Sequence, residues 1–291
     1  MRIALQALTD GLVIGSVYGL VAVGFNLIYG VVGILNTAHA NFIMLGAFVS
    51  LVVVTAFGGG LVFGLAAGLV TGIVAGALLY ITVIRWIEHR QVLAVFIATL
   101  GVAIFLEHAV ARLAGTRPRV YPKLIPNTFR QVGPVQISDA QLAIVILMVL
   151  FILALSWWIR STRTGREIRA LAEDSVVAAT LGIHVARLRL LTVVVASAVA
   201  ALTGVLLSNL FGSIGPFIGQ SVALKMFIVA LVAGGGSLGG SAIIGLALGG
   251  AEGLVVAYLG SSWQDIAGLV GLVGVLLVKP DGLMGRSMRA G

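Results

Sequence analysis

The sequence predicts an all-α, polytopic integral membrane protein with about eight or nine transmembrane helices, some of them short or broken. Of its 291 residues, 60% are hydrophobic and only 10% are charged, whereas a soluble domain carries about 25% charged residues. Apolar runs of about twenty residues, long enough to cross the hydrocarbon core of a bilayer, recur along the whole chain. Because lipid offers the backbone no hydrogen-bond partners, these runs are expected to be helical.

The apolar segments follow one another closely, and we treat residues 1–291 as one transmembrane domain. In chain order they cover residues 9–31, 34–57, 61–84, 92–111, 140–159, 190–211, 223–238, 241–259 and 263–279. Segment 34–57 leaves two alternatives open. If it crosses the membrane fully, there are nine spans and Met1 lies outside the cell; if it dips in and returns, there are eight and Met1 lies inside.

The polar segments set the orientation through the positive-inside rule. Residues 85–90, the charged stretch 160–189 and a tail with Arg286 and Arg289 are all basic, and we expect them in the cytoplasm. This choice puts the loop at about 112–139 outside, although its five basic residues conflict with the rule. We accept that conflict because the opposite orientation would export both the charged stretch and the tail.

Composition and motifs exclude several classes of function. The chain has no cysteine, which excludes disulfides and thiolate metal sites, and its four scattered histidines predict no metal site. The net charge of +8 is concentrated in loops, so topology and anionic lipid explain it and we expect no nucleic-acid partner. No G-x-x-x-x-G-K-[ST] motif is present, so we expect no ATP site on this chain.

Glycines at every fourth position form the clearest repeat in the chain. They occur at Gly64, Gly68, Gly72 and Gly76, and similar ladders begin at Gly11 and Gly245. Small residues at this spacing let helix backbones approach closely. We expect packing within the subunit, with a dimer seam as the alternative. A second set is expected to form a tight turn or helix break: Gly234, Gly235, Gly236 and Gly239.

A polar cluster between the first two apolar runs is the candidate translocation pathway. It consists of Asn36, Thr37, His39, Asn41 and Phe42. Polar groups at membrane depth need partners or a water-filled path, and broken helices at such places often line a route for substrate. The alternative is a water-exposed turn followed by a helix cap. These small, uncharged residues suit a passage without a high-affinity site.

Two ionisable residues lie within apolar runs. Glu252 adjoins the glycine ladder that begins at Gly245, so we expect it to face protein, as a structural hydrogen-bonding group, part of the pathway or a proton relay. Lys225 lies early in its span and is expected to extend toward the interface. One deep acid argues against a proton-coupled pump.

The charged stretch 160–189 predicts a short cytoplasmic helix. Residues 167–181 are good helix formers, with Glu173 and Asp174 in the middle, and Gly182 is placed to end the helix as a left-handed cap. Such an amphipathic helix either lies on the membrane or docks into a groove on a soluble subunit.

Seven stretches together resemble the permeases of bacterial ABC importers, and more narrowly the branched-chain amino acid (LIV-type, LivH-like) permeases. They are RALAED at 169–174, AA at 178–179, LGI at 181–183, GSVYGL at 15–20, YGVVGILN at 29–36 with AH at 38–39, GGGSLGG at 234–240 and KPDGLMGR at 279–286. The resemblance covers nearly the whole chain. It departs from the family pattern at Ala40 and Asn41, where a glycine followed by an acidic residue is expected.

The resemblance implies a single permease domain in the bacterial inner membrane and a division of labour. The partners would be a second permease subunit (LivM-like) or a second copy, two cytoplasmic ATPases, an external substrate-binding protein and the lipid bilayer. ATP and Mg²⁺ would bind to the ATPases and no cofactor to this chain. The residues expected to couple to the ATPases are Arg169, Glu173, Asp174, Ala178, Ala179, Leu181, Gly182 and Ile183.

The expected function is therefore ATP-driven import of branched-chain or other small amino acids by a chain that is not itself an enzyme. Within the same class, the cargo could instead be urea, short amides or other small organic solutes. A stand-alone secondary transporter or channel is a further alternative. A membrane-embedded enzyme would need a pair of deep acids or a cluster of histidines, and the sequence offers neither.

Overall fold

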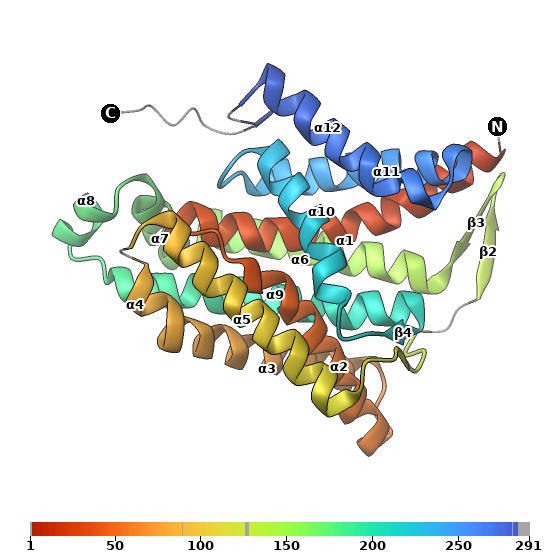
Figure 1. Cartoon of the computed structure of the whole chain (residues 1–291), viewed down its shortest axis with the longest axis horizontal. Helices are drawn as coiled ribbons and strands as arrows, with labels where there is room; N and C mark the ends of the chain where they lie inside the picture. Colours follow the sequence, from red (N-terminus) through yellow and green to blue (C-terminus); the bar gives the residue numbers. More distant parts are fainter. Residues whose placement is uncertain (1, 89, 126–127, 281, 285–291) are drawn as a thin grey trace.

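The computed structural model describes residues 2–88, 90–125, 128–280 and 282–284, and within them the fold is all-α and polytopic (Figure 1). Eight helical segments in this part of the chain are long and apolar enough to cross a membrane. They are α1 (Arg2–Val32), η1 with α2 (Thr37–Ala40 and Asn41–Phe57), α3 to α4 (Leu61–Leu79, the π-helical turn η2 at Tyr80–Ile84, and Arg85–Ile87), α5 (Val92–Ala114), α6 (Asp139–Ser161), α9 (Val185–Phe211), α11 (Leu238–Leu259) and η3 with α12 (Ser261–Trp263 and Gln264–Val278).

Helix α10 (Ile218–Ala233) is apolar but, at 16 residues, shorter than the other spans. The span predicted at 223–238 is wrong in its bounds, since the helix begins and ends five residues earlier. Its end is set by Gly234 and Gly236, which adopt φ angles of +93° and +77°. This left-handed backbone stops a helix and is one that residues other than glycine rarely adopt.

The junctions between helices gather at two opposite ends of the molecule. At one end Arg189 of α9 forms an ion pair of 3.0 Å with Glu88, and the amide of Leu283 donates to the carbonyl of Val232 over 2.8 Å. At the other end Gln6 of α1 donates to the carbonyl of Gln136 over 2.9 Å. The described amino end of α1 therefore lies beside the 112–139 loop and opposite the 160–189 stretch.

Segment 34–57 thus makes a full passage between the two ends, as one of the two alternatives predicted. With α10 included, the described chain passes between the ends nine times. Residues 85–88 and the 160–189 stretch share one end, as the charge pattern requires. Met1, Arg286 and Arg289 lie outside the described residues.

Short strands occupy the 112–139 loop, which the sequence did not predict. Strands β2 (Phe129–Val132) and β3 (Val135–Ser138) form an antiparallel hairpin. Strand β1 (Arg119–Val120) pairs with β4 (Ser213–Ile214), which follows α9. These pairings fasten the loop to the end of α9 and cover the helix ends on this side.

Helix α1 is the axis of the fold, because it contacts α11, α9, α10 and α6. Its contact with α11 is made at glycines. A Cβ on Gly15 would lie 2.6 Å from the carbonyl oxygen of Gly245, and one on Gly249 would overlap the Cα of Gly15 and the carbonyl oxygen of Gly11. The two backbones therefore touch directly, which side chains would prevent.

The glycine ladder of α3 packs in the same manner against α9 and within the subunit. A Cβ on Gly72 would lie 2.5 Å from the Cα of Ala198, and one on Gly76 would lie 2.7 Å from the Cβ of Ser197. Gly68 faces Ala201 and Val205, and Gly64 faces Ser50 and Leu124. All four glycines thus serve contacts within the chain, as expected.

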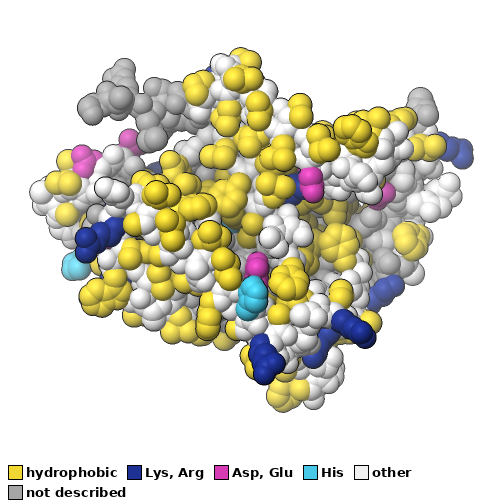
Figure 2. All heavy atoms as spheres, viewed as in Figure 1, with side chains coloured by type: hydrophobic (Ala, Val, Ile, Leu, Met, Phe, Trp, Pro, Cys, Tyr) yellow, Lys and Arg dark blue, Asp and Glu magenta, His cyan; other side chains and the backbone are white. Residues whose placement is uncertain are grey.

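The outer surface is apolar where lipid would lie. Hydrophobic side chains are spread across the face in Figure 2, while most of the lysine and arginine side chains lie toward its margins. Exposed large apolar residues come mainly from α3, α5, α6 and α12, whereas most of α1 and α9 is buried. The core is thus a central pair of helices surrounded by others that face lipid on one side.

We expect the Gly249→Val substitution to destabilise the fold, because the added side chain would displace the backbone of α1. Overpacking costs about 1–3 kcal/mol, so the thermal midpoint in detergent should fall by roughly 2–12 °C. Gly274→Val on α12 is the matched control, since a Cβ there meets nothing within 4 Å. Equal midpoints for the two variants would contradict the proposed role of the contact between α1 and α11.

Candidate functional site

The charged stretch forms two short helices where one was predicted. Helix α7 covers Arg163–Glu173 and helix α8 covers Ser175–Thr180. The expectation that Asp174 lies in mid-helix is wrong, since its backbone is extended and its side chain accepts hydrogen bonds from the amides of Val176 (2.8 Å) and Val177 (3.0 Å). Capping the second helix satisfies two amides that otherwise lack partners, so it competes with continuing the first. Glu173 is the last residue of α7.

Helix α7 is held tightly against the end of α6. Thr162 caps it by accepting from the amide of Gly165 over 3.0 Å, and a Cβ on Gly165 would overlap the carbonyl oxygens of Trp158 and Ile159. Arg169 donates to the carbonyl oxygen of Ile159. The predicted coupling residue Arg169 thus anchors α7 to α6, and two apolar residues of the helix, Ile168 and Leu171, are buried beneath it.

Helix α8 lies at the end of the molecule opposite the 112–139 loop (Figure 1). Its large apolar side chains are exposed there. Val176 is 72% exposed, Val177 53% and Leu181 73%; we call these three residues the α8 tip. Gly182 has φ +81° and ends the helix, while Ile183 donates back to the carbonyl of Ala178 over 3.1 Å. Gly182 therefore adopts the left-handed backbone expected of it.

The predicted coupling residues divide between the exposed surface and its support. Glu173, Asp174, Ala179, Leu181 and Gly182 are exposed, whereas Ala178 is buried and Ile183 is half-buried. Sequence reasoning missed Val176 and Val177. The available signal was a pair of adjacent β-branched apolar residues directly after an aspartate cap, within a charged stretch.

The predicted pathway residues lie at a break between α1 and α2. Gly33, with φ +77°, ends α1, and the Asn36 side chain accepts from the amide of Ala38 over 3.2 Å at the start of η1. Thr37 contacts Thr99 of α5 through their hydroxyl oxygens at 3.0 Å. The Asn41 side chain donates to the carbonyl of Ala103 over 2.9 Å.

The break is enclosed by protein. Asn36, His39, Asn41 and Phe42 are at most 2% exposed and Thr37 is 8% exposed. The rings of His39 and Phe42 meet edge to face, with centroids 6.4 Å apart. Among the described residues that line the two cavities below, none comes from 36–42. The structure therefore brings these five residues together at a helix break within the core.

Glu252 lies apart from that break, in a network of charges whose Lys225 and Glu252 side chains are buried and whose Asp265 side chain is 68% exposed. Lys225 of α10 forms ion pairs with Glu252 of α11 and, over 2.8 Å, with Asp265 of α12. Gln264 donates to the second carboxylate oxygen of Glu252 over 2.8 Å. The expectation that Lys225 extends to the interface is wrong: its side chain is 5% exposed, because the buried carboxylate of Glu252 and the exposed carboxylate of Asp265, both from neighbouring helices, bind its ammonium group.

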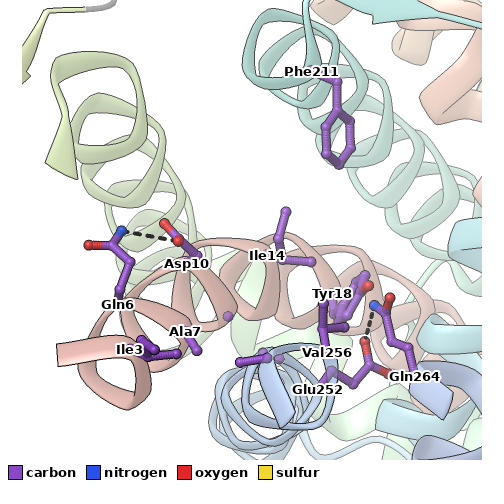
Figure 3. A pocket seen from close by; sticks show the side chains of 14 residues that line it. Ile3, Gln6, Ala7, Asp10, Ile14, Tyr18, Phe211, Glu252, Val256 and Gln264 are labelled. Atoms are coloured by element: carbon purple, nitrogen blue, oxygen red, sulfur yellow. Dashed lines mark hydrogen bonds between the residues drawn. The ribbon is translucent and has the colours of Figure 1, made fainter. Parts of the chain in front are cut away.

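Two cavities adjoin α1 near the end that carries the 112–139 loop. The larger, which we call the α1–α11 cavity, has a volume of about 570 Å³, and Figure 3 shows its lining side chains. The smaller, the α9–α10 cavity, has about 430 Å³. Ile14, Tyr18 and Phe211 line both cavities, so the two share a wall. Of the predicted site residues in the described chain, Glu252 alone lines either of these two cavities.

No group of three or more His, Cys, Asp or Glu side chains in the described parts of the chain is arranged to hold a metal ion. The buried charges of Lys225 and Glu252 form an ion pair with each other, and Gln264 donates a hydrogen bond to Glu252. Their arrangement can orient helices and attract or repel a charged solute.

Comparison with known proteins identifies close relatives. A family model described as "Branched-chain amino acid transport system / permease component" matches residues 7–278. The chain is 36% identical over 298 residues to the high-affinity branched-chain amino acid transport system permease protein LivH of Escherichia coli, covering 97% of this chain and 96% of the relative. It is 33% identical, with the same coverage, to the permease protein BraD of Pseudomonas aeruginosa. The solved structure of PsaBC from Streptococcus pneumoniae in complex with Fab shares the fold, with a TM-score of 0.51 and 14% identity over 97% of this chain and 93% of that chain.

The buried network gives a prediction for stability. Lys225→Met should leave Glu252 without its cation in the interior, and breaking a buried ion pair in this way costs about 3–5 kcal/mol. The double variant Lys225→Met/Glu252→Gln should recover more than half of the lost stability, because the uncompensated charge is gone. Lys123→Met, in the exposed loop, should change stability by less than about 0.5 kcal/mol. Thermal unfolding in detergent measures all three, and a double variant no more stable than Lys225→Met alone would contradict the pairing.

Proposed function

The chain belongs to the family of permease components of branched-chain amino acid transport systems, and from this we propose that it is the membrane-spanning subunit of a binding-protein-dependent ABC importer. Its location would be the bacterial inner membrane. Its cargo would be branched-chain amino acids, the substrates that the names of its relatives state. Those names favour amino acids over urea or short amides.

The observation that carries the proposal is the α8 tip. Three large apolar side chains are exposed to more than half of their surface on a short helix between two membrane passages. Exposed apolar surface in water is costly unless a partner covers it. A soluble subunit with a complementary groove is such a partner, and an amphipathic helix in a groove is a common mode of recognition.

The tip is mechanically connected to the membrane helices, which suits a subunit that receives force. Helix α7 contacts α1, α6 and α9, and α8 contacts α9. Close backbone contact at Gly165 and the hydrogen bond from Arg169 leave little room for α7 to move without α6. A pull on the tip would therefore tilt α6, and α1 through its contact with α7.

The energy source would lie on other chains. The printed sequence contains no phosphate-binding P-loop, so ATP and Mg²⁺ would bind to two cytoplasmic ATPase subunits, and this chain would have no enzymatic activity of its own. A second permease subunit, of the LivM type or a second copy, would complete the pathway. An external binding protein would deliver the amino acid to the end that carries the 112–139 loop.

The break at 36–42 would serve as a hinge in that pathway. Its backbone changes from α1 to an extended stretch, a 3₁₀ turn and α2 within a few residues, and broken helices at membrane depth are where transporters change conformation. Hydrogen bonds from Thr37 and Asn41 to α5 would hold one state.

The experiment that tests the proposal replaces the apolar tip by charge. We expect Val176→Asp and Leu181→Asp each to reduce co-purification of the ATPase subunits in mild detergent by about tenfold or more, as loss of an interface hot spot does. Val120→Asp is the matched control, since Val120 is 83% exposed at the opposite end of the molecule. Undiminished co-purification with both tip variants would rule out docking at this surface.

The orientation of the chain can be tested with single cysteines, because the natural sequence has none. A membrane-impermeant thiol reagent added to intact cells should label Arg117→Cys, in the 112–139 loop, and should label Thr180→Cys, at the end of α8, only after permeabilisation. The two sites lie at opposite ends of the fold. The reverse pattern of labelling would invert the topology.

A further inference from the structure

We propose that the α1–α11 cavity is the chamber that receives the transported amino acid within this subunit. The aliphatic side chain of the substrate would lie against Ile14, Tyr18 and Phe211, and its ammonium group would face Glu252. This inference rests on the proposed importer function and deepens it, because it assigns the substrate to particular residues of this chain.

The position of the cavity suits a substrate delivered from outside. Gln6, which lines it, is hydrogen bonded to Gln136 in the 112–139 loop, and Phe211 is the last residue of α9 on the same side. The α9–α10 cavity continues the space along α1, since Ile14, Tyr18 and Phe211 line both. A solute could therefore pass from the loop end along one wall of α1.

The size of the cavity fits a small organic ligand. Binding sites for such ligands have volumes of roughly 300–1,000 Å³ and mostly apolar walls, and this cavity has about 570 Å³. Its walls are largely apolar and come from α1, α9 and α11, with Gln264 of α12 as a further lining residue. The apolar lining side chains are Ile3, Ala7, Ile14, Phe211, Val256 and Ala257.

The charges on the cavity wall distinguish between the two ends of an amino acid. Asp10 and Glu252 line it, and no lysine or arginine is among its lining residues in the described chain. A wall with this balance attracts an ammonium group and repels a carboxylate. An aliphatic amine is therefore expected to enter more readily than the matching aliphatic acid.

Both carboxylates are held in place by hydrogen bonds, and Figure 3 shows one partner of each, Gln6 and Gln264, which also line the cavity. Asp10 accepts hydrogen bonds from Gln6 (3.0 Å) and Gln141 (2.9 Å). Glu252 is bound by Lys225 and Gln264. Fixed carboxylates present their charge without reorganisation of the site. Because these partners also weaken the field, the chamber suits brief occupancy by a passing substrate.

Tyr18 lies between the charged part of the cavity wall, at Glu252, and its apolar part, at Ile14 and Phe211. In Figure 3 its ring is beside Glu252 and Gln264, and Ile14 lies one turn along α1, on the side toward Phe211. A substrate with its ammonium group near Glu252 would therefore have its side chain directed along α1 toward Ile14 and Phe211. This direction leads into the α9–α10 cavity.

Single cysteines provide the test, since the chain has none of its own. The assembled importer, reconstituted in vesicles with its ATPases and binding protein, would carry Ile14→Cys and be treated with a charged, impermeant methanethiosulfonate reagent from the external side. Modification should reduce ATP-driven leucine uptake by about tenfold, because a charged adduct would occupy the chamber. Val256→Cys, on the opposite wall, is the second variant if the first fails to fold.

Two control positions distinguish the effect of an adduct inside the chamber from the modification of any exposed cysteine. Val120→Cys, in the external loop, should be modified rapidly without loss of uptake. Leu12→Cys lies on the same helix as Ile14 and is 39% exposed, but it lines neither cavity. Its modification should be slow and should leave uptake unchanged.

Protection by ligands tests the chemistry of the wall. Leucine at about ten times its half-protecting concentration should slow modification of Ile14→Cys by about tenfold, since only unoccupied chambers react. The amine 3-methylbutylamine, which keeps the ammonium group, should protect, and 4-methylpentanoate, which lacks it, should not. Equal protection by the acid would overturn the assigned orientation.

Full uptake after complete modification of both Ile14→Cys and Val256→Cys would overturn the proposal that this cavity receives the substrate. The cavity would then be a site occupied by lipid or by the second permease subunit. That failure is distinguishable from failure of the importer proposal. If only the chamber assignment fails, the unmodified variants would still take up leucine with ATP and retain their ATPases. If the importer proposal fails, they would do neither.

Discussion

The direct contact between the backbones of α1 and α11 is the constraint on which the rest of the structure depends. It is possible because glycines face one another across the contact, as at Gly15 and Gly245. In lipid, helices gain little from burying apolar surface, and close packing of this kind is what holds them together. The contact makes α1 an axis with α9, α10 and α6 around it. It also shapes the α1–α11 cavity, since Gly11, Gly249 and Gly253 form part of the cavity wall.

Much of the fold could be predicted from the sequence, because its signals are local. The length and hydropathy of the apolar runs are sufficient to predict the membrane spans. Glycines at every fourth position are sufficient to predict which helix faces pack closely. The left-handed end of α8 at Gly182 follows from glycine alone. The helix break at Asp174 could not be predicted with the same ease, since both a continuous helix and a capped pair satisfy the backbone. Here two amide hydrogen bonds to one carboxylate favour the pair.

The candidate site was harder to predict, because it depends on contacts between distant segments. Lys225 is paired with Glu252 and Asp265 from two later helices, and no local pattern reports that neighbourhood. A lone lysine in an apolar run is ordinarily expected at the interface, which is why its burial was missed. The two cavities likewise follow from how helices meet. The polar break at 36–42, by contrast, was visible as a run of small polar residues.

The same helix, α1, connects the two regions that the proposals single out. At one end it contacts α7, which supports the α8 tip, and at the other it lines the α1–α11 cavity through Asp10, Ile14 and Tyr18. A rigid helix transmits displacement over its whole length, and at 1.5 Å per residue α1 with its 31 residues extends over about 46 Å. Movement of α7 would therefore reach the cavity wall without any intermediate chain of side-chain changes. Because the opposite wall is α11, joined to α1 by backbone contact, a tilt of α1 carries α11 along. The cavity can then widen against α9, at Phe211, and against α12, at Gln264, so these are the walls where the two states would differ.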